Sequence, residues 1–502
     1  MASPHRLATE AATAVLGEGG NAVDAAIAAA AVLTVVYPQN VALGSDLVAL
    51  VRFPDGRMIC INATGGAPAA ESAERLRARH GESIPVHGID TITVPGGVGG
   101  WGLLHRLAGA TPWERLFEDP VRFAEEGVPV ARDLAHCLGS APHLWDDPGA
   151  AAVFAPGGVR LELGDIMKQP ALAATLRRIQ ADGADEFYRG RTAEQIVDGM
   201  RKLGSVISRD DLAAYEPEVR DPITARFAGV DVHTSGPNTQ GFVLLRALAA
   251  FEAAGLGPTL LGSDAGVFAD AFREANAVRD ALLADPRFAE VELDTLLSSS
   301  AAALPVPPAR ELPHRPRGDT VGVAVVDSAG FAVSLIQSVY YAFGSGVLEP
   351  NTGVLLHNRG TSFSLRDDSP NAVAPRKRPA HTLMPVLVTR DGSLSWALAT
   401  QGGQGQPQVH AQLLLRLLNG ASPREAVSLP RFIVGGGTPV HPAETVIVEE
   451  DADPAARRAL VASGDTVEVG AMSDLVGQAN IVSAVGPLAA ASDPRADGAV
   501  LG

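Results

Sequence analysis

The sequence predicts an α+β protein in which a helix-rich first part and a strand-rich second part build one fold. Helical periodicity dominates up to about residue 304, whereas strand-like runs dominate after residue 320. The segment between them, 304–317, has five prolines and three arginines. Because such a run can form neither a helix nor a central strand, we expect an exposed loop where the two parts meet.

The individual elements follow from periodicity and turn signals. The first part opens with a helix at 5–17, a Gly-Gly-Asn break and an all-round apolar helix at 22–36. A hairpin at 46–52 and 58–63 surrounds a Pro-Asp-Gly-Arg turn, and further on come a strand at 230–234 and a helix at 265–283. The second part is expected to contain strands at 320–326, 331–339, 353–357, 384–389, 395–400, 444–449 and 480–485, with a helix at 409–418.

Composition limits the classes of partner and site. With 46% hydrophobic and 19% charged residues the chain reads as globular, and its net charge of −17 argues against nucleic acid or an anionic membrane. The apolar run 22–36 is too short to cross a bilayer and lacks the features of a signal peptide, so we expect a cytoplasmic protein. Cys60 and Cys137 are expected to be two buried thiols. Since no zinc-type spacing, phosphate loop or dinucleotide fingerprint occurs, we expect neither a metal nor a cofactor.

Thr320 is the candidate that carries chemistry. It follows the Pro/Arg-rich segment and Gly318-Asp319, and it opens a run of small and β-branched residues. If the bond between Asp319 and Thr320 breaks, Thr320 gains a free α-amine that can act as the base for its own hydroxyl. Taken alone, the local pattern favours an ordinary threonine at the start of an edge strand.

A wider set of motifs resembles the gamma-glutamyltranspeptidase family of N-terminal nucleophile hydrolases. The resemblance runs along nearly the whole chain, and its motifs occur in the family's order. It implies a four-layer αββα sandwich built jointly by two subunits cut from one precursor, a large one of residues 1–319 and a small one of residues 320–502. The matching stretches are 19–26, 67–70, 94–96, 285–288, 325–327, 343–346, 377–379, 402–403 and 492–495.

The resemblance also implies catalytic roles. Thr320 would be both the nucleophile of self-cleavage and the nucleophile of turnover. Gly402 and Gly403 match the glycines whose backbone N–H groups bind the oxyanion. Ser338 falls where the family places a hydroxyl against the nucleophile, although a small strand residue would read the same way.

The substrate positions depart from the family pattern. The arginine that holds the glutamyl carboxylate is replaced by Thr64, and the acid that holds the amino group is replaced by Ser362 with Arg359 close by. A site that loses an acid and gains an arginine favours a carboxylate or keto acid over an ammonium group. Arg359 could instead be a structural arginine, and His381 a wall residue without substrate contact. The remaining replacements are a strand asparagine by Tyr340 and a Ser-Ser pair by His381 and Thr382.

This pattern is similar to the subgroup that includes oxamate amidohydrolase and the homologues of alkylproline antibiotic biosynthesis. It implies a hydrolase for a small acidic substrate with an amide-like carbonyl, with transfer as a further activity. The alternatives are a C–C hydrolase that removes an oxalyl-type fragment and an unprocessed, inactive homologue that serves as a scaffold. The scaffold alternative rests on Val321-Gly322 after the nucleophile and on the unusual stretch 39–46. The cleaved subunits would form a heterodimer, or a dimer of heterodimers.

Overall fold

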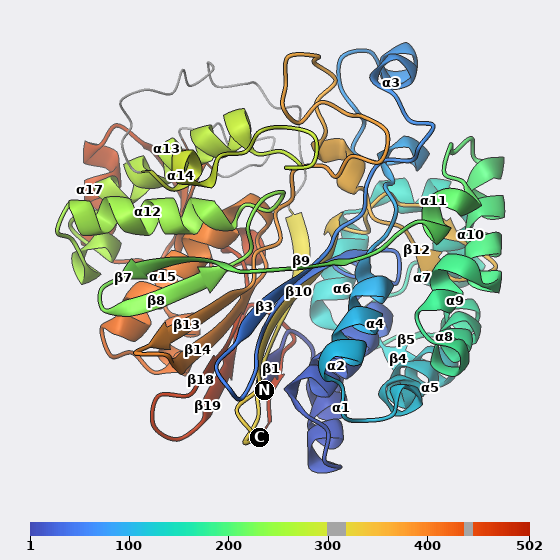
Figure 1. Cartoon of the computed structure of the whole chain (residues 1–502), viewed down its shortest axis with the longest axis horizontal. Helices are drawn as coiled ribbons and strands as arrows, with labels where there is room; N and C mark the ends of the chain where they lie inside the picture. The colour runs from blue at the N-terminus through green and yellow to red at the C-terminus, as the bar shows by residue number, and fades with distance from the viewer. Residues whose placement is uncertain (299–317, 436–444, 502) are drawn as a thin grey trace.

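The computed structural model of the chain describes residues 1–298, 318–435 and 445–501. Two sheets lie face to face at the centre of the molecule, with α12 and α13 on one outer side and α2 and α4 on the other (Figure 1). The predicted αββα sandwich is therefore confirmed. The Pro/Arg-rich segment 304–317 lies outside the described residues.

The first sheet combines strands from both parts of the chain. Its order is β20-β1-β9-β10-β2-β3-β6, so the strand that holds Thr320 lies between the first strand of the chain and β10. The predicted sharing of one fold by the two parts is thus confirmed. The strands are β1 Ala2–Ser3, β2 Asp46–Arg52, β3 Met58–Ala63, β6 Glu218–Arg220, β9 Gly318–Val326, β10 Ala332–Tyr341 and β20 Ala499–Val500.

The second sheet has the order β19-β18-β14-β13-β8-β7. It too takes strands from both parts, because β7 and β8 precede residue 320 and the other four follow it. Both sheets are antiparallel throughout. The strands are β7 Ile223–Phe227, β8 Val230–Thr234, β13 Val386–Arg390, β14 Ser393–Thr400, β18 Ala479–Ser483 and β19 Ala489–Ser492.

The helices cover the outer faces of the two sheets. The break before α2 (Ala22–Val36) is a capping box: the Asn21 side chain accepts from the N–H groups of Val23 and Asp24, and the Asp24 carboxylate accepts from the Asn21 N–H. The cap explains why the Gly-Gly-Asn sequence ends one helix and starts the next. The other main helices are α1 Arg6–Gly17, α4 Gly97–Ala108, α5 Glu118–Glu126, α8 Pro170–Asp182, α12 Gly241–Ala253, α13 Ala265–Leu282 and α15 Gln406–Leu418.

Shorter helices and strands complete the described part of the chain. They are the helices α3 Ala73–His80, α6 Arg132–Gly139, α7 Pro148–Phe154, α9 Asp185–Arg189, α10 Arg191–Lys202, α11 Arg209–Ala213, α14 Leu293–Leu297, α16 Pro423–Ser428 and α17 Pro454–Ala462, and the strands β4 Val128–Pro129, β5 Ile166–Met167, β11 Leu348–Glu349, β12 Val354–Leu355, β15 Phe432–Val434, β16 Thr445–Glu449 and β17 Thr466–Gly470.

The period of two along the strands decides which side chains face the space between the sheets. In β9, Val321, Val323 and Val325 pack under the helices, whereas Ala324 and Val326 belong to the apolar layer between the sheets. In β10, Leu335 and Val339 lie under the helices and Ile336 lies between the sheets. By the same alternation Thr320 and Ser338 face the space between the sheets, where they meet.

Most predicted elements are confirmed, and three expectations are corrected. The strand expected at 353–357 is reduced to β12, Val354–Leu355, because the segment that follows it turns into the site. Cys60 is buried as expected, but Cys137 is only half-buried, since α6 lies on the outer rim. The strand of Thr320 begins at Gly318, two residues earlier than expected.

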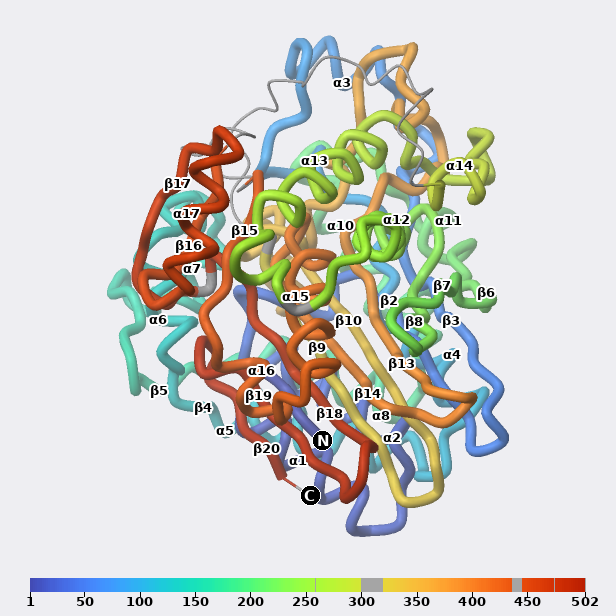
Figure 2. The backbone as a smooth tube through the Cα atoms, turned by 90° about the vertical axis from the view of Figure 1, so that its left-hand side faces the viewer, coloured from blue at the N-terminus to red at the C-terminus, as the bar shows by residue number. Residues whose placement is uncertain are grey.

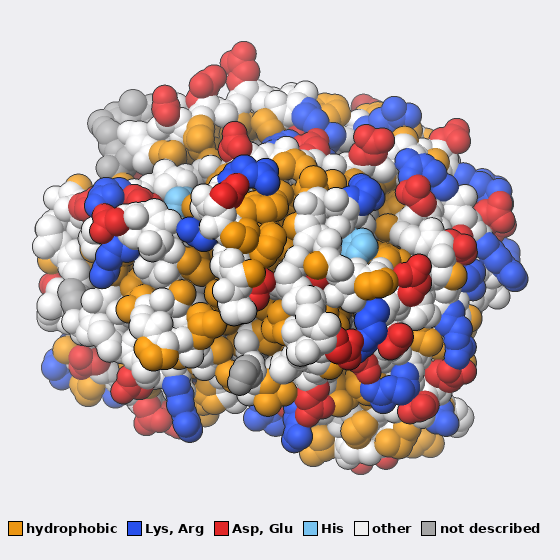
Figure 3. All heavy atoms as spheres, turned by 60° about the horizontal axis from the view of Figure 1, so that its bottom comes forward, with side chains coloured by type: hydrophobic (Ala, Val, Ile, Leu, Met, Phe, Trp, Pro, Cys, Tyr) orange, Lys and Arg blue, Asp and Glu red, His pale blue; other side chains and the backbone are white. Residues whose placement is uncertain are grey.

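The surface carries mixed charge on the face turned forward in Figure 3, where acidic and basic side chains alternate around apolar patches. Within the described residues, no helix is both long and apolar enough to cross a membrane. The first and last described strands are neighbours, and the Met1 amino group donates to the Leu501 carbonyl at 3.0 Å. These two strands accordingly lie together at one edge of the molecule (Figure 2).

Candidate active site

The candidate nucleophile is buried where β9 and β10 lose their regular pairing. Thr320 is 1% exposed and lies at the open end of this hairpin. Between Gln337 and Tyr340 the register shifts by a bulge, and Tyr340 takes a positive φ of 84°. A bulge breaks the ladder locally and bends its strand, and this one lies directly beside Ser338.

Ser338 links the Thr320 hydroxyl to the bond that would be cut. The Thr320 hydroxyl donates to Ser338 Oγ at 3.1 Å, and Ser338 Oγ donates to the carbonyl oxygen of Asp319 at 2.5 Å. The backbone N–H of Tyr340 donates to the same Ser338 oxygen at 2.8 Å and holds it in place. The structure thus brings Thr320 and Ser338 together, as expected from the sequence.

The Gly402-Gly403 turn packs beside the nucleophile strand. It follows the end of β14, and the short 3-10 helix Gly403–Gly405 (η7) that it opens contacts β9. Gly402 has a φ of 133°, which favours glycine. In the described part of the chain no hydrogen bond engages the amide N–H of either glycine. Two backbone donors on a turn that packs against the strand of Thr320 suit the binding of an oxyanion.

Arg359 is fixed as a rigid cation close to the nucleophile. Its guanidinium carbon lies 3.6 Å from the centre of the Tyr340 ring, a cation–π contact. Nη1 donates to Thr382 Oγ1 at 3.0 Å, while Nη2 donates to the Ala380 carbonyl at 2.7 Å and to the Ser362 hydroxyl. Four of the predicted substrate residues therefore form one cluster: Tyr340, Arg359, Ser362 and Thr382.

His381 lies behind this cluster with both ring nitrogens engaged. Nδ1 accepts from the Leu383 N–H at 3.3 Å, so Nε2 carries the proton and donates to Asp46 Oδ2 at 3.1 Å. The second Asp46 oxygen accepts from the N–H groups of Gly65 and Gly96, each at 3.1 Å. These contacts favour the wall-residue interpretation of His381 over a polar contact with substrate.

Burial controls the charges of this region. Burial raises the pKa of Asp46 to about 7, against the hydrogen bonds from Gly65 and Gly96 and the nearby charge of Arg359. Burial, together with the Arg359 charge, holds the pKa of His381 well below its usual value, and burial lowers the pKa of His357 to about 4. Both imidazoles are neutral at neutral pH, and Arg359 is the cation stacked on Tyr340.

The Thr64 side chain is held by two asparagines. Its hydroxyl donates to Asn62 Oδ1 at 2.7 Å and accepts from Asn238 Nδ2 at 3.3 Å. The Asn238 carbonyl in turn accepts from the backbone N–H of His381 at 2.7 Å. Thr64 therefore supports the loop of His381, and its described hydrogen bonds run to asparagines rather than to Arg359.

Three buried polar residues of the site were not predicted from sequence. Asn40 Nδ2 donates to the Thr320 carbonyl and to Gln401 Oε1, both at 3.1 Å. Gln240 Nε2 donates to the carbonyls of Gly403 and Thr382, each at 2.8 Å, and so ties the glycine turn to the Arg359 cluster. The third residue is Asp46. The signal for Asn40 and Asp46 was the polar character of the stretch 39–46, whereas Gln240 carries no local signal.

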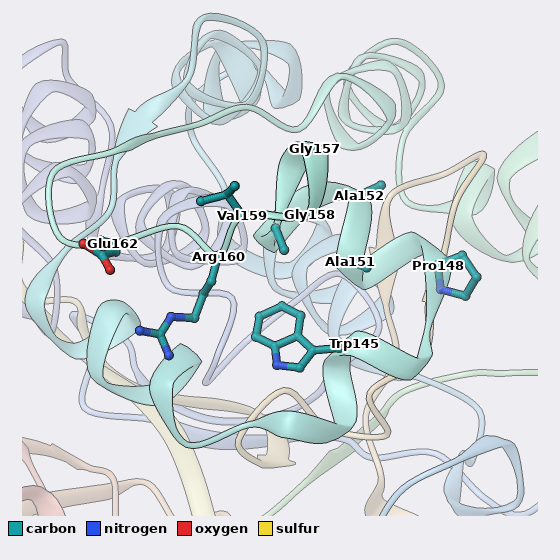
Figure 4. Close-up of a pocket in the computed structure, with 10 residues that line it drawn as sticks. Trp145, Pro148, Ala151, Ala152, Gly157, Gly158, Val159, Arg160 and Glu162 are labelled. Carbon is teal, nitrogen blue, oxygen red and sulfur yellow. The ribbon is translucent and has the colours of Figure 1, made fainter.

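Two further features lie apart from this chemistry. Among the described residues, no group of three or more His, Cys, Asp or Glu side chains is placed to hold a metal ion. A groove beside α7 is lined by Trp145, Pro148, Val159 and Arg160 among others (Figure 4), and its lining includes none of the predicted site residues. The candidate site is therefore the buried one around Thr320.

Comparison with known proteins identifies the family of the chain. The Gamma-glutamyltranspeptidase family profile matches residues 8–502. The oxamate amidohydrolase proenzyme of Klebsiella pneumoniae is 37% identical over 518 residues, covering 100% of this chain and 97% of that protein. The glutathione hydrolase-like YwrD proenzyme of Bacillus subtilis is 36% identical over 519 residues, with coverage of 100% and 98%.

Solved structures share the whole fold. The cephalosporin acylase from Bacillus halodurans superposes with a TM-score of 0.91 at 32% identity, covering 100% of this chain and 95% of that chain. The structure of an LmbA2991 variant superposes with a TM-score of 0.90 at 27% identity, with coverage of 100% and 97%. Family profile, relatives and fold agree along the whole chain. This chain belongs to the gamma-glutamyltranspeptidase family and is a hydrolase of the N-terminal nucleophile type.

Proposed function

We propose that the chain cuts itself between Asp319 and Thr320 and then uses Thr320 to hydrolyse an amide-like bond in a small substrate that carries a carboxylate or keto-acid group. One observation carries the proposal: a continuous run of contacts from the Asp319 carbonyl through Ser338 and Tyr340 to Arg359. It joins a bond to be cut, its nucleophile and a cation in one buried site.

The cut uses the groups as they lie in the uncut chain. Thr320 Oγ adds to the carbonyl carbon of Asp319, whose oxygen is already polarised by the Ser338 hydroxyl. The C–N bond breaks, and the Thr320 nitrogen leaves with the proton of the hydroxyl. Water then hydrolyses the ester, which gives a carboxylate at Asp319 and a free hydroxyl and α-amine at Thr320. Residues 1–319 and 320–502 become the two subunits of a heterodimer.

Turnover repeats the same chemistry on a substrate. The Thr320 α-amine takes the hydroxyl proton as Oγ attacks the substrate carbonyl, and the amide N–H groups of Gly402 and Gly403 stabilise the oxyanion. The leaving amine takes the proton, and water then releases the acid from Thr320. Ser338 keeps the nucleophile aligned, since its hydroxyl is itself fixed by the Tyr340 N–H.

Charge favours a small acidic substrate over a glutamyl group. Arg359, held on the Tyr340 ring, offers a planar cation that suits a carboxylate, while the neutral Ser362 stands where transpeptidases hold an ammonium group with an acid. The similarity to an oxamate amidohydrolase supports this, because oxamate is an amide beside a carboxylate. Tyr340, Thr382, His381 and Thr64 would shape the remaining walls.

Substrate comparison tests the proposal. Purified enzyme is offered oxamate, an oxalyl-bearing compound and a gamma-glutamyl anilide, and the products are identified. We expect Arg359→Ala to lower kcat/KM for the acidic substrate at least about 30-fold, because truncating one partner of a buried charge pair costs about 2–5 kcal/mol. Arg359→Lys should recover only part of this loss, since an ammonium lacks the two-donor fork.

The matched control is Arg366→Ala, which removes an exposed arginine seven residues away that pairs with Asp368. It should leave kcat/KM unchanged. Efficient release from the glutamyl anilide, equal in wild type and Arg359→Ala, would contradict the proposed specificity. Cleavage of a carbon–carbon bond in the oxalyl compound, without amide hydrolysis, would instead assign the C–C hydrolase alternative.

A further inference from the structure

Asn40 is a buried amide whose two ends are used unequally. It is 1% exposed, and its Nδ2 donates to the Thr320 carbonyl and to Gln401 Oε1 at 3.1 Å each. Its Oδ1 is buried and has no hydrogen-bond partner among the described residues. A buried polar atom without a partner costs stability, so its retention calls for a reason.

The orientation of this amide is determined by its surroundings. The Thr320 carbonyl can only accept a hydrogen bond, so the end of Asn40 that faces it must be the NH₂ group. The backbone carbonyl of Asn40 also accepts from the Val339 N–H at 3.0 Å, which anchors the residue to β10 beside Ser338. The unpartnered oxygen shares a carbon atom with Nδ2 and therefore lies in the same buried space next to Thr320.

The proposed cut creates a donor in that space. Hydrolysis of the bond between Asp319 and Thr320 adds OH to the Asp319 carbonyl and hydrogen to the Thr320 nitrogen, which turns one peptide N–H into an amine with two or three hydrogens. We infer that Asn40 is a positioning residue for this amine: its Oδ1 accepts a hydrogen bond from the Thr320 α-amine after the cut. The inference rests on the proposed function, since only a cut chain has that amine.

Such a bond would orient the catalytic base. With Oδ1 holding one amine hydrogen and Nδ2 holding the Thr320 carbonyl, Asn40 would fix the first residue of the small subunit at both ends of its backbone. Through Gln401, which directly precedes Gly402, the same side chain also connects the base with the glycine turn that would bind the oxyanion. A free N-terminal residue otherwise loses the restraint that the peptide bond supplied.

The test uses the pH dependence of kcat/KM, whose ascending limb reports the base in the free enzyme. In Asn40→Asp a carboxylate replaces the amide beside the amine and stabilises its protonated form. The midpoint of the ascending limb should therefore shift to a pH about one unit higher. In Asn40→Ala the acceptor is gone, so the midpoint of the ascending limb should shift to lower pH. Because the amine is no longer oriented, kcat should also fall about tenfold or more. Opposite shifts are not what a purely structural role would produce.

A second readout follows the amine directly. The small subunit contains one lysine, Lys377, besides its α-amine. The extent of acetylation of the Thr320 α-amine is measured as a function of pH, by mass spectrometry of the N-terminal peptide of the small subunit. The pH at which acetylation sets in should show the same two opposite shifts. In the described part of the chain, the ionisable groups near Thr320 that stay unchanged in both variants include Asp46, Tyr340, Tyr341, His357, Arg359, His381 and the new carboxylate of Asp319.

Asn480 supplies a matched control. Its Nδ2 donates at 2.9 Å to the carbonyl of Gly322, which lies two residues after Thr320 in β9. Its Oδ1, like that of Asn40, has no partner among the described residues. Because Gly322 gains no amine, Asn480→Asp should leave the limb in place. The inference would be overturned if the midpoint of the ascending limb is the same in wild type and Asn40→Asp. It would also be overturned if Asn40→Asp and Asn480→Asp shift that midpoint equally.

Two other outcomes are also decisive. If both Asn40 variants fold but stay uncut, Asn40 acts in the cut rather than on the amine, and the inference is overturned. If the wild type itself stays uncut or shows no turnover, the proposed function fails. That result comes from the wild type alone and does not depend on the Asn40 variants.

Discussion

At the scale of single residues, the site depends on which hydroxyl can reach which carbonyl. Thr320 and Ser338 come from neighbouring strands, and the alternation of side chains turns both toward the space between the sheets. Ser338 touches both the Thr320 hydroxyl and the Asp319 carbonyl, so one small side chain serves the bond and its nucleophile. The Thr320 hydroxyl and the Asp319 carbonyl are thus connected through a single side chain.

Replacing Thr320 tests its two roles. Thr320→Ala should leave a folded but uncut precursor, because the change removes one hydroxyl and a methyl group from a large core. Thr320→Ser keeps the hydroxyl and should cut slowly with reduced turnover. A denaturing gel resolves the cut from the uncut chain, and N-terminal sequencing of the small piece should read Thr-Val-Gly-Val in the wild type. Two pieces from Thr320→Ala would show that another residue makes the cut.

At the scale of elements, the site depends on how closely β9 approaches β14 of the facing sheet. A Cβ atom at Gly322 would lie 2.7 Å from the backbone carbon of Ala399 and 2.8 Å from the backbone nitrogen of Thr400. Val321, on the other face, is fully buried under the helices. Packing thus accounts for Val321 and Gly322, the two residues after Thr320. Their departure from the family pattern does not by itself indicate an inactive homologue.

Gly322→Ala should therefore push the two sheets apart next to the glycine turn. We expect a loss of about 1–3 kcal/mol in the free energy of unfolding and slower self-cleavage, because the clash is with backbone atoms that cannot rotate away. Denaturant unfolding and the rate of the cut measure the two effects. Gly17→Ala is the control, since a Cβ atom there meets nothing within 4 Å. Equal stability of the two variants would refute the close-approach argument.

Most elements could be predicted from the sequence because their patterns are local. The hairpin 46–52 and 58–63 follows from alternation and a turn, and it is confirmed residue by residue as β2 and β3. The bulge at Tyr340 could not be predicted, since it depends on Ser338, Arg359 and the strand beside it. Gln240 was missed for the same reason: it bridges two carbonyls that come more than 140 residues later.

At the scale of the whole molecule, the proposed cut divides a chain but leaves its sheets intact. The cut falls inside β9, after its first two residues. In the first sheet the rest of β9 and β10, from beyond the cut, lie between β1 and β2 from before it. The second sheet likewise joins β8 to β13. The subunits would share three apolar layers, and separating them would expose all three.

We therefore expect residues 1–319 and 320–502 to stay together after the cut. On size-exclusion chromatography without denaturant, the cut protein should elute with both pieces in one peak, at the position of the uncut Thr320→Ala precursor. The pieces should separate only in denaturant, together with the loss of the folded signal. Dissociation in dilute buffer while each piece stays folded would contradict the shared-core description.

The closeness of Met1 and Leu501 has a consequence for engineering. Since the Met1 amino group already touches the Leu501 carbonyl, a short linker could join the two ends and let the chain be reopened before Thr320. Such a circular permutant would be translated with its nucleophile next to the initiating methionine. Removal of that methionine would then expose the α-amine without any self-cleavage, so that maturation and catalysis become separable by genetics.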